Sequence, residues 1–156
     1  MAYKSAKTYE EAKQIGHQAI LIAESFQSRF KPMSHERPKA LFPVANVPVI
    51  LYAIQFLALN KVNYIIIATP HISEELREEV GKLREGLFAG RFKNIKIKYE
   101  KLKEPYCLAN GLREISQRND LLDDFIVMYS DIVCNADLGP AIKMHYDIKA
   151  IEKADK

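Results

Sequence analysis

The sequence has 156 residues, a net charge of +3, 48% hydrophobic residues and 28% charged residues. This length allows one domain with its own core, and the composition excludes a disordered chain. No apolar run reaches the ~20 residues of a membrane span, and the mild charge does not call for nucleic acid or an anionic membrane. Two cysteines make no disulfide framework, and no secretory signal precedes the first predicted strand. We therefore expect a soluble, cytoplasmic protein with no direct contact to membrane or nucleic acid.

The N-terminal segment predicts a short polar helix. Thr8 and Glu11 have the spacing of a capping box, in which two side chains satisfy free backbone amides at a helix start. Gly16 is expected to end this helix. We interpret residues 1–17 as an N-terminal helical extension and residues 18–156 as the main domain.

The rest of the chain alternates between strand and helix patterns. Apolar runs with the length of buried strands occupy residues 19–23, 64–68 and 125–129. Residues 95–100 alternate strictly between polar and apolar, which predicts a half-exposed strand near a sheet edge. Helices are expected near residues 48–60, from Ser73 through Leu83 and Leu87 until the stretch 86–90 breaks the helix, at 108–118 and at 140–148. Strands alternating with helices predict an α/β fold with a mainly parallel sheet covered by helices on both faces.

A basic loop between the first main-domain strand and the next helix has the layout of a phosphate-binding site. It carries Arg29, Lys31, Arg37 and Lys39, and Pro48 stands where the helix would begin. Backbone amides and cations at the end of a strand can converge on an anion. This loop has no glycine between Ala23 and Arg29, however, so nothing there lets the backbone close tightly around a phosphate.

The stretch 18–50 resembles the signature of the sugar-phosphate nucleotidyltransferases, roughly LAGGxGTRLxPLTxxxPKxLxPVxxxPxI. The matching residues are Arg29, Pro32, Pro38, Lys39, Leu41, Pro43, Val44, Pro48 and Ile50. The three signature glycines fall on Glu24, Ser25 and Gln27. An altered loop on this frame, together with LANGLREI from Leu108 and DFIVMYSDIVCN from Asp124, is similar to the epsilon-subunit family of eukaryotic translation initiation factor 2B. The resemblance implies a Rossmann-like, GT-A-like nucleotidyltransferase domain and covers the front part of the family's domain, so we expect a truncated domain.

The resemblance also implies roles for the residues of the basic loop. Arg29 and Lys39 match the two cations that hold phosphates in the active enzymes of the family. Glu24 brings a negative charge toward an incoming triphosphate, and the side chains of Ser25 and Gln27 hinder backbone approach. We interpret the five residues as a vestigial phosphate loop whose nucleotidyltransferase chemistry is lost. The alternative is that the two cations are solvated charges with partners such as Glu36.

Asp131 follows the apolar run at 125–129 and matches the metal-binding aspartate of the family. A carboxylate there suits magnesium, but in the active enzymes a second aspartate much later in the chain completes the site. We expect Asp131 to be a vestigial ligand that orders a loop or caps a helix, and we expect no metal and no cofactor.

Lysines and arginines alternate with apolar residues from Arg91 to Lys103. One interpretation is a face for RNA. The other is an edge strand that lysines protect from unwanted pairing, and this is the interpretation that we favour.

The resemblance implies a non-catalytic module that supports guanine-nucleotide exchange on initiation factor 2 through subunit assembly. Its expected partners are other subunits of factor 2B, the gamma type first, and initiation factor 2. The alternatives are an active sugar-phosphate nucleotidyltransferase of the guanylyltransferase type, and a gamma-type subunit of the same factor. The exchange domain of the family is expected to be absent from this chain.

Overall fold

The structure of this protein is a computed structural model that describes residues 16–23, 30–33, 37–83, 92, 94–103, 108–118, 121 and 124–154. The predicted helix before Gly16 and the loop residues 24–29 lie outside these residues. No helix in the described ranges is long and apolar enough to cross a membrane.

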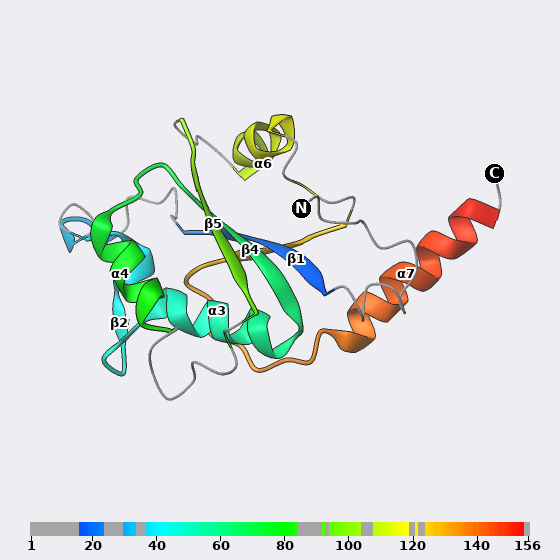
Figure 1. The fold of residues 1–156 in the computed structure, drawn as a ribbon, viewed down its shortest axis with the longest axis horizontal. Coiled ribbons are helices and arrows are strands. Elements are labelled where there is room, and N and C mark those ends of the chain that lie inside the picture. The colour runs from blue at the N-terminus through cyan, green and yellow to red at the C-terminus, as the bar shows by residue number, and fades with distance from the viewer. Residues whose placement is uncertain are drawn as a thin grey trace.

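The core of the fold is a four-stranded sheet in the order β5-β4-β1-β6 (Figure 1). Each neighbouring pair of strands in it is parallel. The strands are β1 (His17–Ile22), β4 (Val62–Thr69), β5 (Lys96–Lys101) and β6 (Ile126–Tyr129). The four predicted strands of the main domain are therefore confirmed, and β5 lies at an edge of the sheet as its alternating pattern predicts.

The helices also begin where the sequence predicts them, although the predicted helix from Ser73 ends at Lys82 and the rest of its predicted length, from residue 84, lies outside the described residues. They are α3 (Val49–Leu59), α4 (Glu74–Lys82), α6 (Leu108–Gln117) and α7 (Gly139–Ala154). Ser73 caps α4, because its Oγ accepts a hydrogen bond from the amide of Leu76 at 3.2 Å. A short 3-10 helix, η2 (Lys39–Leu41), and an antiparallel hairpin of β2 (Pro43–Val44) and β3 (Val47–Pro48) precede α3.

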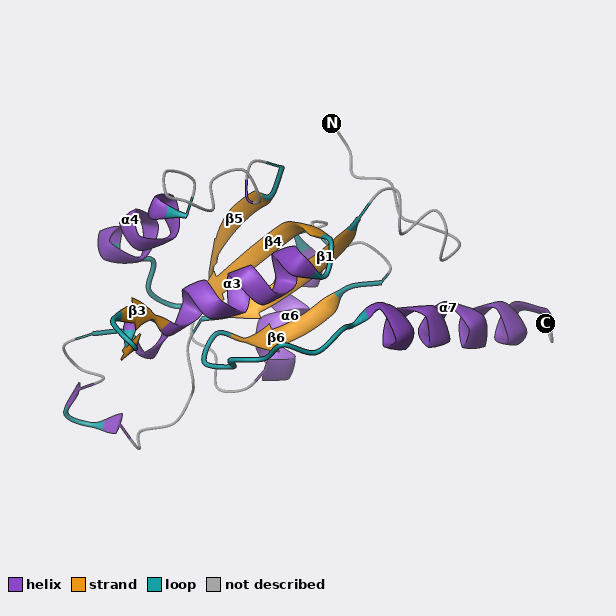
Figure 2. Ribbon diagram, turned by 90° about the horizontal axis from the view of Figure 1, so that it is seen from below, coloured by secondary structure: helices purple, strands orange, loops and turns teal. Residues whose placement is uncertain are grey.

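The two faces of the sheet bury alternate residues of each strand. On β1, Ala19 and Leu21 pack with the buried side chains of α3 and α4, whereas Ile20 and Ile22 pack with those of α6. This period of two is the strand geometry itself, since successive side chains point to opposite faces. Figure 2 shows α3 and α6 on opposite sides of the sheet. A mainly parallel sheet with helices on both faces confirms the predicted fold class.

Strand β6 differs from the prediction of a buried strand. It lies at the edge of the described sheet, and Phe125, Val127 and Tyr129 are each more than a third exposed. The other side of β6 is covered, because Met128 belongs to the core between the sheet and α3. The apolar run could not reveal this difference, since it looks the same in a central strand as in an edge strand with one covered face.

Helix α7 extends away from the sheet in both views (Figures 1 and 2). Within residues 139–152, Tyr146 alone is buried. Met144, Ile148 and Ile151 are exposed and recur at the spacing of one helix face. The helix therefore presents an apolar stripe to its surroundings.

Candidate functional site

The candidate site lies where three parallel strands end. The amide of Ala23 donates to the carbonyl of Ala68 at 2.9 Å, and the amide of Ser130 donates to the carbonyl of Ile22 at 2.9 Å. These bonds extend the pairing of β1 with β4 and β6 by one residue and align their carboxyl ends. Ligands of open parallel sheets bind at this edge, so the residues that follow these strands are the candidates for ligand contact.

Lys39 reaches this edge from the loop that follows β1. It begins η2, whose next two residues, Ala40 and Leu41, are buried in the core and fix the backbone of the loop. The ammonium of Lys39 lies 4.7 Å from the centre of the Phe30 ring, and Phe30 in turn meets Phe42 edge to face at 5.9 Å between ring centres. The aromatic pair therefore holds the stem of Lys39 in place, and the ring face adds a favourable cation–π contact.

Asp131 is the second residue after β6 and forms an ion pair with Lys39, between Oδ2 and Nζ. The two side chains are 31% and 18% exposed, so most of each is covered by the protein. The structure thus brings together two candidate residues that are 92 positions apart. An incoming anion would compete with Asp131 for the Lys39 ammonium, and a cation bound at Asp131 would displace that ammonium.

The described residues do not assemble a magnesium site. Asp131 offers one carboxylate, and the described ranges contain no group of three or more His, Cys, Asp and Glu side chains placed to hold a metal ion. Magnesium sites combine carboxylates, waters and substrate phosphates in an octahedron.

The remaining loop candidates, Glu24, Ser25, Gln27 and Arg29, lie outside the described residues. Their assignment as a vestigial phosphate loop stays a prediction. Arg37, by contrast, is described and forms an ion pair with Glu75 of α4. This contact joins the loop to α4 on the same side of the sheet.

The basic stretch around β5 is partly engaged in ion pairs. Lys98 contacts Glu100 at 2.7 Å, and the nearly buried Glu100 also pairs with Arg118 at the end of α6. The hydrogen bond to Glu100, with the charges of Glu100 and Glu114, raises the pKa of Arg118 despite the opposing effect of burial. Lys96 and Lys101 stay exposed on the edge strand, where lysine disfavours pairing with another chain.

Sequence reasoning missed a second group of polar residues. His17, Asp124 and His145 line one cavity, and they come from the amino end of β1, the residues before β6 and the first turns of α7. No motif marks them. Their position just before or at the start of two neighbouring parallel strands was the available signal, but it required the strand order.

The sequence profile of the nucleotidyl transferase family matches residues 18–154. The chain belongs to this family. Its fold is similar to that of a solved structure: a crystal structure of UDP-glucose pyrophosphorylase complexed with UDP-glucose superposes with a TM-score of 0.65 at 16% identity, over 88% of this chain and 54% of that one.

Among its relatives, the chain is similar to translation initiation factor eIF2B subunit epsilon of Schizosaccharomyces pombe. The two are 31% identical over 128 residues, which are 82% of this chain and 18% of that protein. The chain therefore spans about a fifth of that relative's length. It is also 27% identical over 130 residues to the catalytic subunit beta of mannose-1-phosphate guanylyltransferase from Xenopus tropicalis, over 81% of this chain and 34% of that protein. The predicted resemblance to the epsilon-subunit family is confirmed.

The prediction that this chain is not an enzyme is wrong on these comparisons. Relatives at similar identity include guanylyl- and uridylyltransferases, and the fold neighbours include a pyrophosphorylase. The prediction rested on the lost glycines, on the negative charge of Glu24 and on the side chains of Ser25 and Gln27. These three residues lie outside the described residues, whereas Lys39 of the same loop contacts Asp131 at the ligand-binding edge. Missing glycines in one turn do not establish loss of activity.

Proposed function

We propose that this chain is a nucleotidyltransferase-fold module of the eIF2B epsilon type that supports guanine-nucleotide exchange on initiation factor 2 by docking to other subunits. The observation that carries the proposal is the similarity to an epsilon subunit over 82% of this chain. We further propose that residues 18–156 form one domain after an N-terminal extension, and that the module works in the cytoplasm.

The exposed apolar side chains of β6 and of the residue before it support a docking role. Phe125, Val127 and Tyr129 are 36%, 38% and 36% exposed, and because they alternate along the strand they point to one face of the sheet. Apolar side chains gathered on one surface favour burial against a partner, because each one removed from water contributes to binding. We call Phe125, Val127 and Tyr129 the β6 surface.

The proposed partner is a gamma-type subunit of factor 2B, and a pull-down with purified subunit tests it. Val127→Lys places a charge in the middle of the β6 surface and should abolish capture. Leu59→Lys is the matched control, since Leu59 is also apolar and exposed but ends α3. Capture that is equal for wild type and both variants would refute docking through the β6 surface. Failure of the wild type to bind any factor 2B subunit would refute the docking function.

The exchange role needs a second assay with fluorescent GDP bound to initiation factor 2. Release should be faster when the chain is added to the gamma-type subunit than with that subunit alone. The chain can shift this equilibrium only if it has different affinities for the GDP-bound and the nucleotide-free state of initiation factor 2. Binding to the gamma-type subunit without faster GDP release would therefore refute the exchange role.

A second candidate function is sugar-phosphate nucleotidyl transfer, and the Lys39–Asp131 pair favours it. The pair places a cation and a carboxylate at the sheet edge where ligands of this fold class bind. The test is pyrophosphate release from GTP with mannose 1-phosphate and magnesium. Release that Lys39→Ala abolishes would establish this function, and release unaffected by Lys39→Ala would trace the activity to a contaminant.

A further inference from the structure

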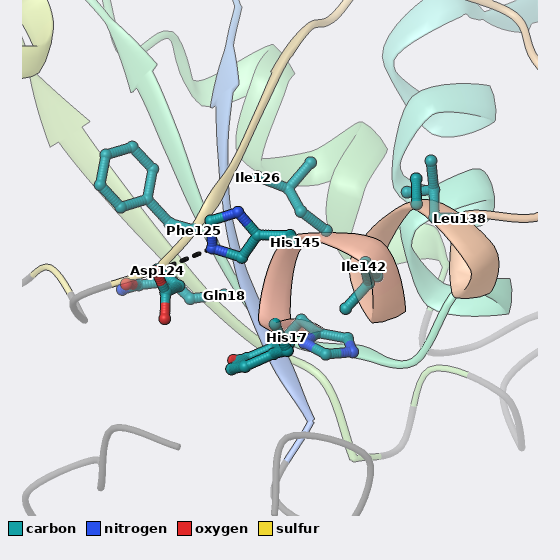
Figure 3. A pocket seen from close by; sticks show the side chains of 10 residues that line it. His17, Gln18, Asp124, Phe125, Ile126, Leu138, Ile142 and His145 are labelled. Carbon is teal, nitrogen blue, oxygen red and sulfur yellow. Dashed lines mark hydrogen bonds and ion pairs between the residues drawn. The ribbon is translucent and has the colours of Figure 1, made fainter. Parts of the chain in front are cut away.

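A cavity of about 400 Å³ lies at the end of the sheet opposite the candidate site (Figure 3). It is bounded by the amino end of β1, the residues leading into β6, and the first turns of α7. Its lining residues are His17, Gln18, Asp124, Phe125, Ile126, Leu138, Ala141, Ile142, His145 and Tyr146. This volume is in the range of small-molecule sites, roughly 300–1,000 Å³.

Most of the wall is apolar. Ile126 comes from β6, while Leu138 and Ile142 come from the start of α7. Figure 3 shows these side chains around one side of the cavity, with His17 below them. Such a wall favours a ligand whose surface is mainly carbon, because its burial removes apolar area from water.

The carboxylate in the lining already has its partners. Asp124 accepts a hydrogen bond from Lys149 on one oxygen, and His145 Nε2 lies 3.0 Å from the other (Figure 3, dashed line). Burial opposes ionisation of Asp124, but the contacts with Lys149 and His145 outweigh it and lower the pKa of that carboxyl. Among the described lining residues Asp124 is the one carboxylate, and its charge is already neutralised by Lys149 and His145 when a charged ligand group enters.

His17 supplies an uncharged polar group at the other side of the cavity. Burial, and secondarily the positive charge of Lys61, lower the pKa of His17, so the imidazole is neutral at pH 7. A neutral imidazole has one nitrogen that donates a hydrogen bond and one that accepts. It is matched by a ligand group that also offers both, such as a carboxamide.

We propose that this cavity binds an uncharged small molecule with an aromatic ring and a polar group of the amide type. The ring packs against the aliphatic wall, and the polar group faces His17. Charged ligands are disfavoured, because they would lose hydration without gaining a free counter-charge from the described lining residues. This cavity is distinct from the candidate site, because Lys39 and Asp131 lie at the opposite, carboxyl ends of the strands.

Binding there ties α7 to the sheet. Within residues 139–152 only Tyr146 is buried, so the helix has few contacts of its own with the body of the protein. A molecule between β6 and Ile142 would contact both elements. Its occupancy therefore slows local opening of the first turns of α7, which amide hydrogen exchange reports.

The test uses three indole compounds that share a ring and differ in charge: indole-3-acetamide is neutral, indole-3-acetate is an anion and tryptamine is a cation. Each is titrated into the full 156-residue protein and followed by two-dimensional amide NMR. Indole-3-acetamide should bind at low millimolar concentration, which is about the strength expected for so small a probe. It should shift the amides of His17 and Ala141 and leave that of Lys39 unchanged. The two charged compounds should bind at least about fivefold more weakly.

Two matched variants locate the site. Ala141→Phe fills the cavity from its own lining and should weaken indole-3-acetamide binding by at least about tenfold, since the ligand and the new ring need the same space. Ala150→Phe adds the same ring to an exposed position of α7 outside the lining and should leave binding unchanged. Equal affinity for the three compounds, shifts centred on Lys39, or retained binding in Ala141→Phe would each overturn the proposal.

Discussion

The Lys39–Asp131 pair can be tested by a double-mutant cycle that compares Lys39→Met, Asp131→Asn and the double variant. Their side chains are 18% and 31% exposed, so the pair is better covered than a typical surface pair but is not sealed from solvent. Exposed pairs contribute up to about 1 kcal/mol, and we expect a coupling free energy near that upper value, ~1 kcal/mol.

The cycle also separates the ion pair from the aromatic contact. Lys39→Met removes the cation–π interaction with Phe30 together with the ion pair, but the Phe30 contribution cancels in the coupling term because it is lost in both arms. Urea unfolding of the four proteins gives the coupling. Repeating it at about 1 M NaCl should reduce the coupling by more than half, since the Debye length falls to roughly 3 Å. A coupling of zero at low salt would show that the pair does not form in solution, and the site geometry would be refuted.

The remaining predictions concern backbone strain and pH. Gly16 has φ +86°, and a Cβ there would lie 2.1 Å from Nδ2 of Asn63, so Gly16→Ala should lower the free energy of unfolding by about 1–2 kcal/mol or more. Gly81→Ala is its control, because α4 leaves open space there, and it should raise stability by roughly 0.5–1 kcal/mol in the same urea melts. The lowered pKa of His17 means that the unfolded chain binds a proton more readily, so stability should fall as the pH drops below about 6.5 toward the folded pKa. His17→Leu should flatten that part of the pH profile, and an unchanged slope would show that His17 does not titrate as described.

The order of elements was predictable because the signals are local. Apolar runs mark β1 and β4, and Ser73 marks the start of α4. The lysines of β5 correctly predicted an edge strand. The exposure of one face of β6 was not predictable from the sequence. Whether that face is buried depends on which helices pack over it, not on the residues of the strand itself.

The site was predictable only in part. The pairing of Lys39 with Asp131 depends on the strand order, which places the loop after β1 beside the end of β6. The resemblance to a known family pointed to both residues, but nothing in the spacing showed that they touch. The cavity near His17 could not be predicted without the strand order, since its polar residues come from three separate segments.

The central claim is that this chain docks to a gamma-type subunit through the β6 surface, and a binding titration tests it most directly. Labelled chain is titrated with purified gamma-type subunit, as wild type and as the Val127→Lys and Leu59→Lys variants. We predict saturable binding that Val127→Lys weakens at least about tenfold, or ~1.4 kcal/mol, while Leu59→Lys binds like wild type. Absence of saturable binding by the wild-type chain, or equal affinity of all three proteins, would contradict the account.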